Sequence, residues 1–277
     1  MLGGTIWKAV EMAMEPLTID DMKAIQLEIM DELDRICHQQ GIQYFIGYGS
    51  LLGAVRHGGF IPWDDDMDVV LMRSEYERLI EGFDGWRASD RFALASYRDG
   101  KSIYPFVKMV DTTTRVLENF VDKGTATGVW VDLFPLDDVN PTDLRPFRRN
   151  ARLSLTRSFI VTDASVGTNS LVKLAKRLVC PFAHRLDALE YARAIDENAK
   201  TACPGGSDRV ADIIGEGKTS LIFPKSLFED AVDVEFEDRT FPAPSGWEEF
   251  LRIQYGDWRT PPPEEDRLIH TFEAYRL

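Results

Sequence analysis

The chain has 277 residues, of which 44% are hydrophobic, and this composition supports a packed core and excludes an intrinsically disordered protein. Acidic residues outnumber basic residues by 46 to 32, which gives a net charge of −14. General coating of nucleic acid is disfavoured, because such binding needs Lys and Arg to displace counterions from phosphates. We therefore expect no nucleic-acid partner.

Three cysteines lie far apart in the sequence, at Cys37, Cys180 and Cys203. The odd count argues against a disulfide framework and a structural zinc site, and it is typical of a reducing compartment. The first residues, Met1–Pro16, contain charges and no uninterrupted apolar stretch, so we expect no secretory signal. A run of about 18 apolar residues is also absent from the sequence. These features predict a cytoplasmic protein.

Thr18 precedes two aspartates and a series of apolar residues at helical spacing, which predicts an N-capped amphipathic helix that ends near Gly41. The β-prone run 43–47 follows. Residues 50–57 then predict a short helix that a glycine pair closes. The apolar, β-branched run 67–72 predicts a strand.

Ser74 is expected to cap the next helix, which we predict to end near Gly82. Four more strands are predicted in the first half of the chain: 91–96, 103–110, 114–118 and 128–134. From about 141 to 203 the sequence has a mainly helical period. The end returns to short strands and one helix before three prolines stop regular structure: 232–236, 239–241, 247–255 and 261–263.

These elements predict an α/β fold with a mixed sheet, as a single domain over 1–277 with a helical insertion at about 141–203. Charge is uneven within it, because the segment 145–185 holds nine basic residues and one acidic residue and so carries +8. One interpretation is a solvated helical face that offsets the acidic remainder. The other is a docking surface for an anionic lipid or glycan.

Asp66 and Asp68 lie two residues apart at the start of a predicted strand. Side chains at this spacing point to the same face of a sheet, where two carboxylates repel each other unless a cation lies between them. A hard divalent ion is the natural partner of such oxygen ligands. Asp64 and Asp65 precede the pair, and we do not expect them to be ligands. The alternative for Asp-x-Asp alone is a solvated acidic turn. An EF-hand fails because its glycine and its later glutamate are missing.

Gly49 and Ser50 lie between a predicted strand and a predicted helix, where free backbone N–H groups bind phosphate well. The alternative is a tight turn that needs glycine. Asp132 lies within an apolar, β-prone run, and a buried aspartate is costly there unless it is paired or metal-bound. Its alternative is a carboxylate that backbone N–H groups satisfy. Together, three carboxylates and a phosphate-binding turn indicate phosphoryl-type transfer.

The order of Gly-Ser, Asp-x-Asp and a later Asp resembles the nucleotidyltransferase superfold that is shared with DNA polymerase beta. Residues 49–69, GSLLGAVRHGGFIPWDDDMDV, are similar to the LicD family, whose relatives include the fukutin-type transferases. Further similar stretches are 17–50, 105–108, 131–137 and 255–262. The resemblance covers residues 17 to about 265 and is weak in the helical middle.

The resemblance implies a nucleotidyltransferase-like core and a transferase that uses a CDP-activated alcohol. CDP-choline is the usual donor of such proteins, and phosphocholine reaches a hydroxyl of a cell-surface glycan, a teichoic-acid precursor or a lipopolysaccharide precursor, with CMP as the leaving group. Asp66, Asp68 and Asp132 would then hold Mg²⁺ or Mn²⁺. Gly49 and Ser50 would contact the diphosphate of the donor.

Arg56 is expected to bind the same phosphates, with a surface ion pair as its alternative. His57 could assist a phosphate or cap the loop. Lys108 lies in an apolar strand, so its ammonium must reach an anion or extend to water. Three tryptophans near these motifs are candidates for a pocket around a quaternary ammonium, although aromatic residues are more often part of the core: Trp63, Trp130 and Trp258.

Two other functions stay open. The first is transfer of a nucleotide from an NTP to a small molecule or protein, because the superfold fixes the metal site and not the group that moves. The second is a binding module without turnover, against which the three aspartates argue. If the acceptor is lipid-linked, the basic segment 145–185 would contact the inner membrane face.

Overall fold

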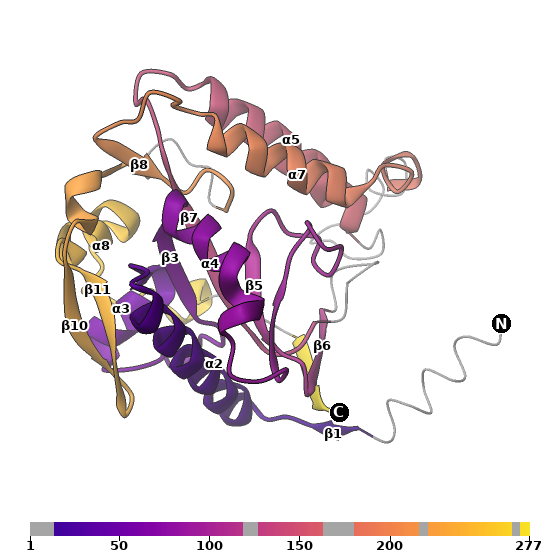
Figure 1. Cartoon of the computed structure of the whole chain (residues 1–277), viewed down its shortest axis with the longest axis vertical. Coiled ribbons are helices and arrows are strands. Elements are labelled where there is room, and N and C mark those ends of the chain that lie inside the picture. Colours follow the sequence, from indigo (N-terminus) through magenta and orange to yellow (C-terminus); the bar gives the residue numbers. More distant parts are fainter. Residues whose placement is uncertain (1–13, 119–126, 163–179, 216–220, 268–271) are drawn as a thin grey trace.

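A mixed sheet forms the centre of the molecule in a computed structural model that describes residues 14–118, 127–162, 180–215, 221–267 and 272–277 (Figure 1). Its strand order is β2-β3-β7-β5-β4, and β8 and β9 extend it from the end of β7. The pair β3 and β7 is parallel and all other pairs of this sheet are antiparallel. Its strands are β2 (Phe45–Ile46), β3 (Asp68–Met72), β4 (Phe92–Ala95), β5 (Val107–Asp111), β7 (Trp130–Asp138), β8 (Arg209–Ala211) and β9 (Phe223–Pro224). The predicted α/β class with a mixed sheet is confirmed.

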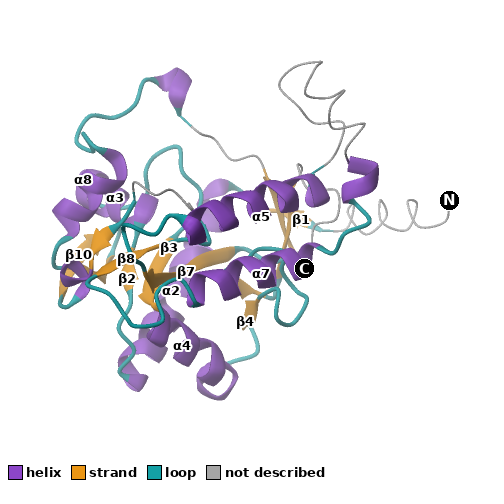
Figure 2. Cartoon of the chain, turned by 90° about the horizontal axis from the view of Figure 1, so that it is seen from above, coloured by secondary structure: helices purple, strands orange, loops and turns teal. Residues whose placement is uncertain are grey.

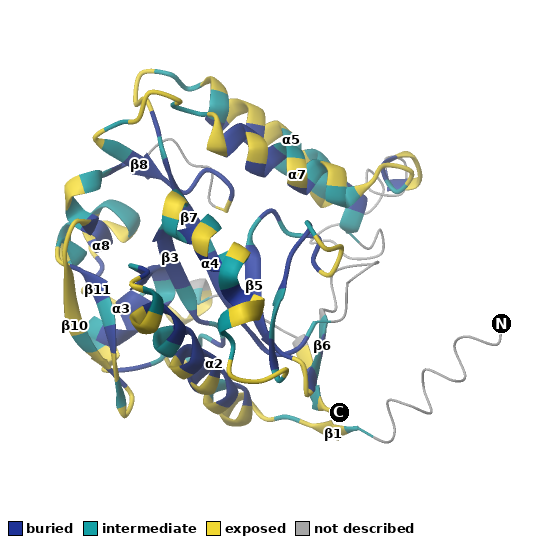
Figure 3. Ribbon diagram, viewed as in Figure 1, coloured by how far each residue is buried: buried dark blue, intermediate teal, exposed yellow. Residues whose placement is uncertain are grey.

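Two helices, α2 (Ile19–Gln40) and α4 (Arg73–Trp86), pack against β3, β5 and β7 on one face of this sheet (Figures 1 and 2). The Thr18 side chain caps α2 and forms a reciprocal capping box with Asp21, while Gly41 ends the helix in the left-handed conformation. The apolar stripe of α2 faces the sheet. Ile29 and Leu33 on the helix, like Val69 on β3, are fully buried. Figure 3 shows buried residues along α2 and β3, with exposed residues on the outer side of α2.

Smaller strands and helices border the central sheet. A three-stranded antiparallel sheet joins β1 (Glu15–Pro16), β12 (Phe272–Arg276) and β6 (Thr114–Glu118), so segments from the two ends of the sequence lie side by side. The hairpin of β10 (Ala231–Phe236) and β11 (Arg239–Pro244) packs beside α3 (Tyr48–His57). The remaining elements near it are η1 (Lys225–Phe228), α8 (Trp247–Tyr255) and η2 (Glu264–Asp266).

Helices α5 (Arg145–Val161) and α7 (Ala188–Lys200) pack along each other beyond the end of β7 (Figure 1). Buried apolar residues between this helix pair and β8 form a second small core: Val139, Phe147, Ile195, Ala199, Ala211, Ile213 and Ile214. Both helices lie within the predicted helical segment 141–203, of which 163–179 is outside the described residues. The division of the chain into one domain with an insertion stays a prediction.

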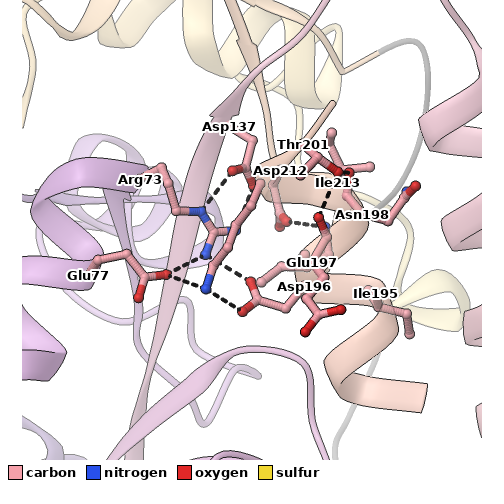
Figure 4. Close-up of polar contacts among 12 residues, drawn as sticks. Arg73, Glu77, Asp137, Ile195, Asp196, Glu197, Asn198, Thr201, Asp212 and Ile213 are labelled. Carbon is pink, nitrogen blue, oxygen red and sulfur yellow. Dashed lines mark hydrogen bonds and ion pairs between the residues drawn. The ribbon is translucent and has the colours of Figure 1, made fainter. Parts of the chain in front are cut away.

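A buried ionic network fastens this helix pair to the sheet (Figure 4). Arg73 at the start of α4 donates two hydrogen bonds of 2.7 Å to Asp137 on β7 and one of 2.8 Å to Asp196 on α7. Glu77 accepts hydrogen bonds from Arg98 and forms an ion pair with Lys200. Burial alone would raise the pKa of Asp196, but the charge of Arg73 and the hydrogen bond from Tyr97 outweigh it, so the pKa falls.

Replacing Arg73 with alanine should lower the free energy of unfolding by about 3–5 kcal/mol, because Asp137 and Asp196 would stay buried without their main cation. Urea denaturation followed by circular dichroism measures the loss. Arg252→Ala is the matched control, since that arginine pairs with Glu249 at an exposed position and should cost at most about 1 kcal/mol. Equal losses in the two variants would contradict the structural role of the network.

The structure departs from the predicted elements in several places. Ser74 does not cap helix α4, because it lies inside the helix and Met72 precedes the first turn. Helix α4 begins at Arg73 and continues past Gly82 to Trp86. Within the helix, the indole of Trp86 lies over Gly82, where a Cβ atom would come within 2.1 Å of the ring. Regular structure also resumes after the three prolines, because β12 finds partners in β1 and β6 that lie far away in the sequence.

Candidate active site

The register of three neighbouring strands places the principal polar residues in one row. Asp68 on β3 lies opposite Asp132 on β7, and Asp132 lies opposite Lys108 on β5. Directly opposite residues share a face of the sheet. Asp66, just before β3, completes the group, and carboxylate oxygens of Asp66, Asp68 and Asp132 lie within 4.8 Å of one another. The structure therefore brings together the three aspartates that the sequence singles out.

The carboxylates around Asp68 lie close to one another and carry the same sign of charge. Burial raises the pKa of Asp68 well above its usual range, and the charges of Asp66, Asp132 and Asp64 raise it further, while a hydrogen bond from the Gly49 backbone opposes them. Such crowding of hard oxygen donors is what a bound divalent cation would relieve. The residues therefore fit a Mg²⁺ or Mn²⁺ site, with Asp66, Asp68 and Asp132 as its ligands. Asp64, Asp65 and Asp66 form a second close group, in which Asp65 is buried and its carbonyl accepts a bond from Gln26.

The start of α3 fits closely against these carboxylates. The backbone N–H of Asp68 donates to the Ser50 hydroxyl at 2.8 Å, and the N–H of Gly47 donates to the Asp68 carbonyl at 2.9 Å. A Cβ atom on Gly49 would lie 2.8 Å from Asp64 Oδ2 and 3.6 Å from Asp68 Oδ2, so only glycine lets the acids approach this backbone. Ser50 is buried and holds Asp68 in place. Gly49 is the member of the pair that faces the carboxylates.

Lys108 occupies an aromatic box beside the acids. Its ammonium lies 3.6 Å from Asp132 Oδ1, 3.5 Å from the ring centroid of Trp130 and 4.6 Å from that of Tyr104. The side chain is only 4% exposed. The sequence left two possibilities for the Lys108 ammonium, an anion or water, and in the structure it reaches the carboxylate of Asp132. Lys108 is therefore a fixed positive charge next to Asp132.

Tyr104 connects this box to helix α5. The guanidinium of Arg157 on α5 lies 5.2 Å from the centroid of the Tyr104 ring, which Lys108 also contacts. The same guanidinium donates to the Ile103 carbonyl at 3.0 Å. The inner side of α5 thus contacts the aromatic box through Arg157.

A pocket of about 370 Å³ opens beside Gly49. Arg56 lines it and donates to the Trp258 carbonyl at 3.0 Å and to His57 Nε2 at 2.9 Å. Burial, and then the charge of Arg56, lowers the pKa of His57. Other residues around the pocket are Leu52, Ile61, Trp63, Asp64, Tyr255, Asp257, Trp258, Thr260, Pro262 and Arg267. A partly aromatic space that both arginines and aspartates line therefore adjoins the turn that faces the carboxylates.

The three tryptophans proposed for a head-group pocket are divided between two places. Trp63 and Trp258 line the pocket, while Trp130 belongs to the box around Lys108. Each of them already has a cation of the protein over its ring: Lys108 over Trp130 at 3.5 Å, Arg267 over Trp63 at 4.2 Å and Arg259 over Trp258 at 4.3 Å. A quaternary ammonium would have to compete for those ring faces.

Tyr48 and Asp212 are site neighbours that the sequence analysis missed. Tyr48 precedes Gly49 and has a φ of 41°, in the left-handed region that residues with a side chain rarely adopt. Its hydroxyl donates to Asp212 at 3.2 Å, and the backbone N–H groups of Ile214 and Gly215 donate to the same carboxylate. Burial raises the pKa of Asp212 to about 6. Asp132 was predicted to be a site residue because it lies within an apolar run. Asp212 also lies within an apolar run, so the same criterion would have identified it.

Comparisons with known proteins show the family to which the chain belongs. The sequence profile of the LicD/FKTN/FKRP nucleotidyltransferase domain matches residues 41–152. Over 95% of its length the chain is 30% identical to the lipopolysaccharide cholinephosphotransferase LicD of Haemophilus influenzae, and the match covers all of that relative. The chain belongs to the LicD family. The resemblance that residues 49–69 indicated is confirmed.

Two further proteins match over short stretches. A segment of 58 residues, 21% of the chain, is 41% identical to 19% of an uncharacterized protein of Rickettsia typhi. A segment of 29 residues, 10% of the chain, is 59% identical to 6% of the human ribitol 5-phosphate transferase FKRP. Among the described residues, no helix combines the length and the apolar character that crossing a bilayer requires.

Asp68→Asn should raise the free energy of unfolding of the metal-free protein by about 1–2 kcal/mol, because it removes one charge from a buried group of acids. The same variant should lose the rise in melting temperature that Mg²⁺ or Mn²⁺ gives the unchanged protein. Differential scanning fluorimetry with and without the ion measures both effects. Asp233→Asn, on an exposed strand, is the control and should change neither. A full metal response in the Asp68 variant would exclude Asp68 as a ligand.

Asp212 should make stability depend on pH. Its pKa of about 6 in the folded protein lies above the ordinary value of 3.8, so its contribution to the free energy of unfolding is greatest below pH 4 and is lost as the pH rises through 6. The stability of Asp212→Asn relative to the unchanged protein should therefore increase by up to about 3 kcal/mol between pH 4 and pH 7. Urea denaturation at several pH values measures this difference, and a difference that does not vary with pH would contradict the burial effect.

Proposed function

We propose that this protein transfers a phospho-alcohol, with phosphocholine as the expected group, from a CDP-activated donor to a hydroxyl of a cell-surface glycan or lipopolysaccharide precursor. The observation that carries the proposal is the set of Asp66, Asp68 and Asp132 held against the glycine turn at Gly49. We further propose that this sheet and the start of α3 form a nucleotidyltransferase-like core.

The relatives support this chemistry. The name of the Haemophilus influenzae relative describes cholinephosphate transfer to lipopolysaccharide, and that of FKRP describes transfer of ribitol 5-phosphate. Both activities move the phosphate ester of a small alcohol. The first relative matches almost the whole chain, so we expect phosphocholine as the transferred group and a lipopolysaccharide precursor as the acceptor. A teichoic-acid precursor offers the same acceptor chemistry.

Asp66, Asp68 and Asp132 would hold Mg²⁺ or Mn²⁺, which when bound neutralises the diphosphate of the donor. The backbone around Gly49 can come close to a phosphate, because no side chain stands between them. Arg56 supplies a guanidinium from the adjoining pocket. Lys108 provides a positive charge whose position the aromatic box fixes before substrate binds.

In the proposed reaction an oxygen of the acceptor hydroxyl forms a bond to the phosphorus that carries the alcohol. The bond from that phosphorus to the oxygen of CMP breaks, and CMP leaves in line with the attack. Asp132 accepts the proton of the hydroxyl, and the Lys108 ammonium lies 3.6 Å from its carboxylate. Most of the rate would come from positioning and charge stabilisation.

Nucleotide transfer is the second candidate, because the matching family profile is described as a nucleotidyltransferase domain. The same acids would then serve an attack on the α-phosphate of an NTP. The two reactions differ in their products, since the first releases CMP from a CDP-alcohol and the second releases pyrophosphate from an NTP.

Incubation with Mg²⁺, a panel of CDP-alcohols and lipopolysaccharide precursors should release CMP from one donor, CDP-choline being expected. Asp68→Asn and Asp132→Asn should each lower this rate by about 100-fold or more, because each removes a metal ligand. Asp233→Asn is the matched control and should keep full activity. Chromatographic detection of CMP measures the rate. Pyrophosphate release from an NTP without CMP release from any donor would replace phospho-alcohol transfer with nucleotide transfer.

A further inference from the structure

The outer side of helix α5 carries a stripe of basic residues that the proposed chemistry does not use. Arg148, Arg149 and Arg152 are exposed, and Leu155 on the next turn is 61% exposed. Spacings of three and four residues place these side chains on one face of the helix. The opposite face packs against the rest of the molecule through buried Phe147, Asn150 and Ile160.

Within the part of the chain that the structure describes, these arginines differ from most basic residues in having no acidic partner. Arg145 at the start of α5 pairs with Asp143 at 2.7 Å, and the arginines of the buried network pair with Asp137, Asp196 and Glu77. Within the described residues, no ion pair involves Arg148, Arg149 or Arg152. Their charge is therefore available to an external anion.

Exposed apolar side chains lie near the C-terminal end of the same helix. Phe182 is 68% exposed and Leu186 is 44% exposed in the turn that precedes α7, and the guanidinium of Arg185 lies 5.7 Å from the Phe182 ring. His184 of this turn contacts the Thr162 carbonyl at 3.3 Å, directly after the end of α5. Basic and apolar groups together distinguish a lipid interface from a soluble polyanion, which has no place for a phenyl ring.

We propose that the membrane-facing surface, defined as Arg148, Arg149, Arg152, Leu155, Phe182 and Arg185, docks on a bilayer that contains anionic lipid. The charge of the chain favours this orientation, because the segment 145–185 carries +8 while the whole chain carries −14. An anionic bilayer attracts this surface and repels the rest of the molecule.

Docking here would place the candidate active site close to the lipid. The inner side of the same helix reaches the site, because Arg157 contacts the Tyr104 ring that Lys108 also contacts. This consequence rests on the proposed function, since a lipid-anchored glycan precursor is the acceptor that would benefit. The docking itself does not rest on it.

Sedimentation with vesicles of phosphatidylcholine and phosphatidylglycerol tests the docking without any substrate. The full chain should bind at about 0.1 M salt and should bind far more weakly at about 0.5 M salt or to vesicles of phosphatidylcholine alone. The triple variant Arg148→Gln, Arg149→Gln, Arg152→Gln should bind about 100-fold more weakly. The matched control removes the same charge from three exposed positions outside the surface: Arg78→Gln, Lys101→Gln and Arg252→Gln.

The apolar part of the surface has its own test. Leu155→Ser with Phe182→Ser should weaken vesicle binding by about 10-fold or more, because two exposed side chains no longer enter the interface. Unchanged binding in this variant would overturn a lipid interface in favour of a site for soluble anions. Equal losses in the arginine triple and its control would overturn the location. Neither result depends on CMP release, so failure of docking and failure of the proposed reaction are separate outcomes.

Discussion

The parallel pairing of β3 and β7 is the constraint on which the site depends. This single pair of strands places Asp68 opposite Asp132, and the antiparallel neighbour β5 adds Lys108 to the same row. A shift of one residue in either register would turn one of these side chains to the opposite face of the sheet. The apolar residues that alternate with them, Val69 and Leu133, are fully buried and so fix the register. The core therefore determines where the charges meet.

Much of the fold could be predicted from local sequence, because its signals lie within a few residues of one another. Thr18 and Gly41 mark the ends of α2, and the run after Met67 marks β3. The strand β12 could not be predicted in this way, since its partners β1 and β6 lie far away in the sequence. Helix α4 was predicted to end too early because a glycine is typical of a helix end, whereas the helix continues through Gly82 to Trp86.

The candidate site shows the same limit. Residue types and spacing pointed to Asp66, Asp68 and Asp132 and to the turn at Gly49, and the structure brings these residues together. The spacing of residues in the sequence could not show which cations lie over the faces of the aromatic rings. Trp63, Trp130 and Trp258 attracted attention as partners of an external cation, yet each ring lies under a cation of the chain itself. Arg259 directly follows Trp258, but Lys108 and Arg267 lie far from Trp130 and Trp63 in the sequence, so only the folded arrangement shows those two pairs.

The position of Trp130 also makes it an internal optical reporter. Indole emission responds to a charge close to the ring. The Lys108 ammonium lies 3.5 Å from the centroid of the Trp130 ring and also forms an ion pair with Asp132. Any ligand that draws this ammonium away from the ring changes the electric field at one tryptophan among six. The difference spectrum between the unchanged protein and a Trp130→Phe variant would isolate that signal. Occupancy of the acidic row could then be followed in solution with no label attached.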